Sequence, residues 1–399
     1  MGPVGHVSIP DLPPPIRREK ATSLSPSRLR WLQNCQFRAL ASVAPSDSLP
    51  ASTVALRGQA IHFVRQHLLA GTWGDSQTAL TAARALYGEA LGRFSPSTQH
   101  FPPMAHPELN LDADPVRRQL RSLAIWADQR RITSTGRQPG SATEALPASM
   151  PLEPRLDYGF EALIASPRLG IRGRADEVRQ VDPGRIEIID LKTGSSSVDE
   201  GDRLQLRAYA LAAQDVDPSV KVSLRIERPG RDPTTVPWGS RERGETQTVI
   251  EDAKQLSVQP GGIPSETATA GPWCASCTLR HICPRYLHQA PSWWVSTGPV
   301  AKAAPLDTWG YVLEQRVRDA GLLLVLRDLV GRRVRVDGLV GVAQEDQVEI
   351  DEPVSLFGLE TTEQALAHGR ARFPRNFHDR VPATTPRWRP ALAPRLFRG

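Results

Sequence analysis

The chain has few cysteines and few aromatic residues, and it has no long apolar run. Its 399 residues include four cysteines, and aromatic residues make up 6% of the total. No stretch approaches the roughly 18 apolar residues that a membrane span needs, and the first 20 residues lack the hydrophobic block of a signal peptide. We therefore expect a cytoplasmic protein without membrane contact. Apolar residues make up 40% of the chain, enough for a sizeable core in one large or two ordinary domains.

A phosphate-binding loop is also absent. No Gly-x4-Gly-Lys-Ser/Thr motif occurs in the sequence, and this motif cradles the phosphates of ATP in many motor proteins. The chain is therefore not expected to carry its own ATP-driven motor. Any step that needs ATP would then depend on a partner ATPase.

The positive charge is concentrated at one end of the chain. The net charge is +6, and residues 370–399 alone carry +7, because eight arginines stand against a single acid, Asp379. Guanidinium groups pair with phosphates, and the aromatic residues of this tail can stack on bases, so the tail suits a polyanion. A solvated or partner-docked tail explains the composition equally well. The arginines are Arg370, Arg372, Arg375, Arg380, Arg387, Arg389, Arg395 and Arg398.

Changes in composition and apolar pattern divide the chain into five segments. Residues 1–22 form an extended proline-rich arm, and residues 23–290 form the main domain, which the cysteines close. A linker over residues 291–305 leads to a small β-rich domain over residues 306–369. The arginine-rich tail over residues 370–399 follows.

The first part of the main domain is predicted to be helical. Ser25 and Pro26 are typical of a helix start, and the helix they begin is expected to carry Cys35. A second helix is expected over Thr53–Ala70, with His62 in its middle, and helical periodicity continues through Ser76–Gln129.

The pattern then changes to β-strands, expected at Leu152–Leu156, Ile171–Val178 and Ile186–Leu191. Because side chains alternate along a strand, Asp190 and Lys192 emerge on one side. Asp176, on the neighbouring strand, can join them.

A helix over Arg203–Ala213 follows, with Gln205 and Tyr209 four residues apart on one face, and a strand over Val220–Arg228 comes next.

These residues match the needs of metal-assisted phosphodiester hydrolysis. Hard Mg²⁺ or Mn²⁺ ions prefer carboxylates such as Asp176 and Asp190, and the nitrogen of His62 completes a manganese-tolerant set. Lys192 can orient the attacking water or offset charge, and Glu153 is a candidate outer carboxylate. Each motif alone is weak evidence, because an Asp-x-Lys pair is usually a solvated strand and a lone helical histidine is usually structural. Their order along the chain is much stronger evidence.

The four cysteines have the spacing of a metal centre. Cys35 stands alone, and Cys274, Cys277 and Cys283 follow about 240 residues later. Cytosolic thiols are kept reduced, so ligation is favoured over disulfides. Four thiolates suit an iron–sulfur cluster or a zinc ion, although compact zinc sites usually take their ligands as two nearby pairs.

Taken in order, the motifs resemble the RecB-like branch of the PD-(D/E)XK nucleases, including the iron–sulfur members among CRISPR-associated nucleases and AddB. The resemblance covers about residues 23–290. It runs from a Ser-Pro-Ser-x-Leu opening, a first cluster cysteine and a Gly-x3-His helix, through Gly-x-x-Asp and Asp-x-Lys-Thr-Gly, to Gln-x3-Tyr and three cysteines. The residues that match these motifs are Ser25–Leu29, Cys35, Gly58, His62, Gly173, Asp176, Asp190, Lys192, Thr193, Gly194, Gln205, Tyr209, Cys274, Cys277 and Cys283.

The resemblance implies an α/β fold with a restriction-endonuclease-like PD-(D/E)XK core and a helical N-terminal cap. It implies a metal site at His62, Asp176 and Asp190, with Lys192, Gln205 and Tyr209 as further catalytic residues, and relatives place the Gln-x3-Tyr helix beside DNA. It also implies a structural 4Fe–4S cluster on Cys35, Cys274, Cys277 and Cys283, with zinc as the alternative.

Beyond the linker, strands are expected at Trp309–Arg318, Leu322–Arg327 and Arg332–Leu339. The sequence of these strands resembles that of the opening strands of an OB-fold. Such a fold would hold single-stranded nucleic acid by base stacking and backbone contacts. A generic small β-barrel that docks a protein partner is nearly as well supported.

The sequence therefore predicts a Mg²⁺- or Mn²⁺-dependent deoxyribonuclease. We expect it to act on single strands or DNA ends, as an exonuclease in preference to an endonuclease, in repair, recombination or antiviral defence against mobile elements. The alternative is a DNA-binding or assembly subunit that keeps the nuclease fold and is active only with a partner or not at all.

Overall fold

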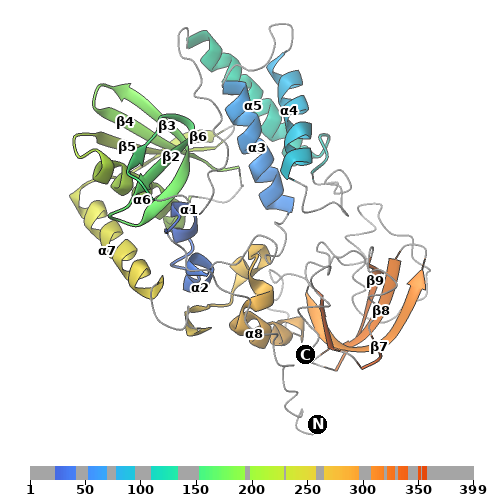
Figure 1. The fold of residues 1–399 in the computed structure, drawn as a ribbon. Helices are drawn as coiled ribbons and strands as arrows, with labels where there is room; N and C mark the ends of the chain where they lie inside the picture. Colours follow the sequence, from blue (N-terminus) through green and yellow to red (C-terminus); the bar gives the residue numbers. More distant parts are fainter. Residues whose placement is uncertain are drawn as a thin grey trace.

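The fold is described from a computed structural model of the full chain (Figure 1). The proline-rich arm, the arginine-rich tail and Gly194 lie outside the described residues. The structure describes residues 23–41, 53–69, 78–94, 109–133, 152–193, 198–228, 231–257, 265–295, 307–318, 321–328, 331–339, 349–351 and 353–356.

The first described residues form two short helices, α1 (Pro26–Leu29) and α2 (Gln36–Leu40), so the prediction of one helix carrying Cys35 is wrong. Cys35 has an extended backbone, with φ −162°, and caps α2 by accepting a hydrogen bond from the backbone N–H of Arg38. The break gives α2 a start of its own, at which the Cys35 thiol is the cap.

Helices α3 (Thr53–Leu69), α4 (Ala79–Phe94) and α5 (Asp114–Thr133) lie side by side, as the helical periodicity predicted (Figure 1). They share a separate apolar core of leucine, alanine and valine side chains. Leu191, from the sheet, belongs to the same core. This contact ties the three-helix group to the end of the strand that carries Asp190.

The main domain is built on a six-stranded sheet with the strands in sequence order. All neighbouring strands are antiparallel except β4 and β5, which are parallel and joined by helix α6. A parallel pair needs such a crossover connection. The strands are β1 (Arg155–Leu156), β2 (Gly159–Ser166), β3 (Ile171–Asp182), β4 (Arg185–Leu191), β5 (Lys221–Arg228) and β6 (Arg231–Val236).

The expected strands β3, β4 and β5 are confirmed, but the region before them differs. The strand expected over Leu152–Leu156 shrinks to the two residues of β1, and β2 was not predicted. Glu153 therefore lies outside any strand and is exposed, so the prediction that a strand carries it is wrong.

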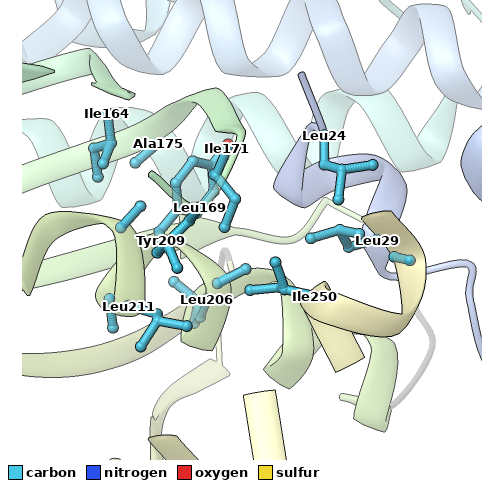
Figure 2. Packing of buried hydrophobic residues seen from close by; sticks show 14 of the residues in the cluster. Leu24, Leu29, Ile164, Leu169, Ile171, Ala175, Leu206, Tyr209, Leu211 and Ile250 are labelled. Carbon is cyan, nitrogen blue, oxygen red and sulfur yellow. The ribbon is translucent and has the colours of Figure 1, made fainter. Parts of the chain in front are cut away.

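Helix α6 (Glu200–Val216) covers one face of the sheet, and α7 (Ser240–Ser257) packs on α6. Figure 2 shows this core, where Leu206, Tyr209 and Leu211 of α6 meet Ile164 and Ile171 of the sheet. Asp199 caps α6 and accepts from the backbone N–H of Asp202, whose side chain accepts from Asp199 in return. This capping box fixes the first turn of α6, which faces the end of β4.

The cysteine segment consists of 3-10 turns at Pro272–Ser276 and Arg280–Ile282, followed by α8 (Pro284–Val295), which extends past residue 290. No helix among the described residues is long and apolar enough to cross a membrane.

A second, four-stranded antiparallel sheet follows in the order β10-β7-β8-β9, which confirms the three strands expected here (Figure 1). Its strands are β7 (Thr308–Arg318), β8 (Gly321–Asp328), β9 (Arg333–Leu339) and β10 (Pro353–Leu356).

Candidate metal-dependent active site

Three carboxylates lie in a row across β2, β3 and β4. Glu161 stands opposite Asp176, because the paired residues on either side of them are in register between β2 and β3. The register of β3 with β4 ends at Glu177 and Ile189, and the next position brings Asp176 to Asp190. Like charges directly opposite one another on a sheet destabilise it, so this row favours a cation between them.

His62 of α3 completes the row. Its Nδ1 lies 3.2 Å from Oδ1 of Asp176. Ligand atoms of His62, Glu161 and Asp176 all lie within 4.8 Å of one another, which is a geometry that can hold a metal ion. The other oxygen of Asp176 accepts the backbone N–H of Leu191, which fixes the carboxylate against β4.

Gly58 explains how α3 comes close enough to deliver His62. A Cβ atom at Gly58 would lie 3.3 Å from Oγ1 of Thr193. The Gln119 side chain of α5 donates to the carbonyl oxygen of the same Thr193. The helix group is therefore held on the chain just past Lys192.

Lys192 lies at the centre of a polar cluster formed by the first turns of α6 and the end of β4. Its Nζ is 2.9 Å from Oδ2 of Asp190 and 3.1 Å from Oδ1 of Asp202, and it donates to Oε1 of Gln205 at 3.1 Å. Gln205 donates through Nε2 to Oδ1 of Asp190 at 2.9 Å. The Gln205 amide thus bridges the Asp-x-Lys pair and fixes both side chains.

Tyr209 is buried and holds the backbone beside the site, not the carboxylates themselves. Its hydroxyl donates to the carbonyl oxygen of Arg174. A Cβ atom at Gly173 would meet the Tyr209 hydroxyl at 2.9 Å and Cδ of Pro26 at 2.7 Å. The Gly-x-x-Asp motif therefore needs a glycine at this position, because a side chain there would collide with Tyr209 and α1.

The pKa values of the two aspartates, Asp176 and Asp190, are shifted in opposite directions. Burial would raise the pKa of Asp176, but His62, Arg65 and the Leu191 N–H outweigh it and lower the pKa below its usual value. Burial, helped by the charge of Asp176, raises the pKa of Asp190 even though Lys192 opposes it.

The pKa values of both basic groups at the site are raised. Burial would lower the pKa of His62, but Asp176 raises it above its usual value. The pKa of Lys192 is also raised, because the carboxylates of Asp190 and Asp202 outweigh its burial and the charge of Arg30. Both shifts favour the protonated forms of these two side chains, which lie against the carboxylates of Asp176, Asp190 and Asp202.

Sequence reasoning missed Glu161 and Asp202. Burial, followed by the charge of Asp176, raises the pKa of Glu161 to about 7. Its backbone has a φ of 50°, in the left-handed region that non-glycine residues seldom adopt. Nothing in the Glu161 sequence context signals a ligand, because its place depends on the register of an unpredicted strand. Asp202 could have been found as the third helical residue of a capping box.

The cysteine segment packs against α2. Arg38 donates to the carbonyl oxygens of Trp273 at 2.8 Å and of Ser276 at 3.1 Å. These bonds bring Cys35, the cap of α2, to the 3-10 turns that carry the other cysteines.

The four thiols are close enough to act on one another. The pKa of Cys274 is raised to about 11, mainly by burial and also by Cys277 and Cys35. That of Cys283 is raised to about 12, mainly by burial and also by Cys277, Cys35 and Cys274. Among the described residues no three cysteine sulfurs lie within 4.8 Å of one another.

The comparisons with known proteins agree with the motifs. Residues 23–284 match the PD-(D/E)XK nuclease superfamily, and the match covers more than half of the chain. The chain therefore belongs to the PD-(D/E)XK nuclease superfamily, whose members are generally metal-dependent hydrolases.

No curated protein matches the chain. Among solved structures it is similar to the crystal structure of SSO0001, at 22% sequence identity and a TM-score of 0.20. That similarity covers 29% of this chain and 51% of the other, so the chain spans about half the length of that protein. Nothing about fold or activity is drawn from this likeness.

Proposed function

We propose that the chain is a Mg²⁺- or Mn²⁺-dependent deoxyribonuclease that cuts single strands or DNA ends. The observation that carries the proposal is the grouping of His62, Glu161 and Asp176, whose ligand atoms lie within 4.8 Å of one another. Asp190 follows on the neighbouring strand β4, outside that group, and is paired with Lys192. The donor set of one imidazole and hard carboxylate oxygens fits these cations. A bound cation would lower the pKa of a ligated water and neutralise charge on the phosphate.

The residues around the cation would have distinct roles. His62, Asp176 and Asp190 are the proposed ligands, and Glu161 is an added candidate on the geometry described above. Lys192 would hold the attacking water or offset charge in the transition state. Gln205 fixes Lys192 and Asp190 by hydrogen bonds, so we assign it a positioning role, and the same role suits Tyr209 through the β3 backbone.

We further propose a structural 4Fe–4S cluster on Cys35, Cys274, Cys277 and Cys283. A tetrahedral zinc ion with Zn–S bonds of about 2.3 Å would draw its sulfurs to within about 4 Å of each other. No three of these sulfurs approach within 4.8 Å, and a cluster spreads its ligands over its corners. Iron and sulfide in anaerobically purified protein, and their loss in Cys283→Ser, would support the cluster; zinc without iron would contradict it.

Exonuclease action, a helicase or ATPase partner, and a place in repair, recombination or antiviral defence remain part of the proposal. They rest on the family resemblance and on the missing phosphate-binding loop.

The test is cleavage of end-labelled single- and double-stranded DNA with Mg²⁺ or Mn²⁺. We expect the intact protein to cut and Asp190→Ala to be inactive, with Arg241→Ala, a side chain 80% exposed on α7, as the matched control. Product ladders from the two labelled ends would give polarity. Intact, cluster-loaded protein that binds DNA and leaves it uncut would favour the alternative of a DNA-binding or assembly subunit.

A further inference from the structure

One face of the C-terminal sheet carries a tyrosine and two arginines in a row. Tyr311 of β7 pairs with Arg327 of β8, which pairs with Arg333 of β9. Arg327 and Arg333 are exposed and Tyr311 is half-buried. The neighbouring row, formed by Val312, Leu326 and Val334, points the other way and is buried. The Tyr311 row therefore faces outward.

The two arginines of this row have no acidic partner among the described residues. Other arginines of the same sheet do, since Arg332 pairs with Asp328 and Arg316 pairs with Glu314. Like charges directly opposite one another on neighbouring strands destabilise a sheet. The pair Arg327 and Arg333 is thus an arrangement that an anion would stabilise.

The sheet of the main domain treats its arginines differently. Arg225 lies 2.5 Å from a carboxylate oxygen of Glu187, and Arg179 lies 2.8 Å from one of Glu177. In that sheet the positive charges of the arginines are compensated by neighbouring carboxylates. The uncompensated row is a local feature of the second sheet.

The aromatic ring of the row has a defined neighbourhood. The Arg327 guanidinium lies 5.9 Å from the centroid of the Tyr311 ring. Two residues earlier on the same face, Trp309 is buried, with its ring 6.1 Å from that of Tyr286 in α8. A Cβ atom at Gly310 would lie 2.1 Å from the carbonyl oxygen of Arg327, so the paired backbones of β7 and β8 lie close together there.

We propose that Tyr311, Arg327 and Arg333 form a binding surface for single-stranded DNA, separate from the cleavage site. Two neighbouring guanidinium groups match successive phosphates, and a ring beside them offers a stacking face for an unpaired base. A duplex hides its base faces, and an acidic peptide would leave the ring without a partner. The choice of DNA rests on the proposed nuclease function; the site itself rests on charge and register.

The test measures binding without cleavage, by fluorescence anisotropy of labelled oligo(dT) with the full chain carrying Asp190→Asn. We expect Arg327→Glu with Arg333→Glu to weaken binding tenfold or more, and to reduce the slope of log affinity against log salt by about 1.4, since each single-strand phosphate contributes about 0.7. Arg327→Gln with Arg333→Gln should reproduce the lower slope if the reversal variant folds poorly. Tyr311→Leu should weaken binding roughly tenfold with the slope unchanged.

The matched control is Arg185→Glu with Arg241→Glu, two arginines with side chains 63% and 80% exposed. An equal loss of affinity in this control would overturn the proposed binding surface, because any reduction in net charge would then be enough to weaken binding. An equal loss of affinity for the oligo(dT)–oligo(dA) duplex would overturn the single-strand assignment. Because binding is read without cleavage, failure of the nuclease proposal would leave this test intact.

Discussion

At the scale of single residues, Gly173 shows most directly how packing positions the site. A methyl group there would meet the Tyr209 hydroxyl and Pro26. We expect Gly173→Ala to lower the free energy of unfolding by about 1–3 kcal/mol, as overpacking of a core does, and to reduce cleavage by displacing Asp176. Gly88→Ala on α4 is the control, because nothing lies within 4 Å of its Cβ position; it should stabilise by about 0.5–1 kcal/mol. Thermal denaturation of both variants checks this.

Tyr87 gives a pH-dependent prediction. Its side chain is fully buried in the three-helix core, and its hydroxyl has no hydrogen-bond partner among the described residues. Burial raises its pKa from about 10 to about 12 despite the charge of Arg57. The unfolded tyrosine ionises first, so the fold keeps its stability below pH 10 and loses some of it as pH rises toward 12.

Tyr87→Phe should therefore be more stable than the parent by about 1 kcal/mol near neutral pH. Its advantage should widen above pH 10, at up to about 1.4 kcal/mol per pH unit. Urea denaturation between pH 8 and 11 measures the difference. A constant difference across this range would show that the hydroxyl ionises equally easily in both states.

The same scale shows what the sequence could and could not predict. His62, Asp176, Asp190 and Lys192 stand in recognisable motifs, and the structure pairs His62 with Asp176 and Lys192 with Asp190. Glu161 stands in no motif, because its position opposite Asp176 depends on register.

At the scale of elements, β2 was missed for a related reason. Its run of buried residues, Ala162–Ser166, does not alternate, and Glu161 interrupts the strand with a positive φ. The break between α1 and α2 was missed because apolar spacing continues across it.

The junction between the cysteine segment and β7 depends on one buried carboxylate. Asp307 accepts from Nε of Arg280 at 2.8 Å and from the Tyr286 hydroxyl at 2.6 Å, and Arg280 also donates to the carbonyl oxygen of Cys277 at 2.8 Å. Asp307→Ala leaves the Arg280 charge buried, which costs about 3–5 kcal/mol. We expect faster hydrogen exchange in residues 265–295 and in β7.

Asp112→Ala is the matched control, because its partner Arg84 and Asp112 itself are both exposed. An exposed pair contributes at most about 1 kcal/mol. Equal effects of the two variants would contradict the structural role of Asp307.

At the scale of the whole molecule, the proposed cluster would join the first described residues to the last part of the main domain. Because α1 packs on α6 and β3, losing this link should loosen the packing of the first described residues on the main domain. We expect Cys35→Ser to lower the melting temperature and to speed hydrogen exchange in residues 23–41 and 265–295, while β3 to β5 stay protected. Uniform loss of protection would instead indicate that the cysteines hold the whole fold.

The central claim is that one site binds a divalent cation and uses Lys192 for chemistry. The most direct measurement is Mn²⁺ binding by electron paramagnetic resonance, with cleavage assayed on the same samples, for Lys192→Met and Asp176→Ala. We predict that Lys192→Met keeps Mn²⁺ and loses cleavage, whereas Asp176→Ala loses both. Cleavage at the parent rate by Lys192→Met, or undiminished Mn²⁺ binding by Asp176→Ala, would contradict the account.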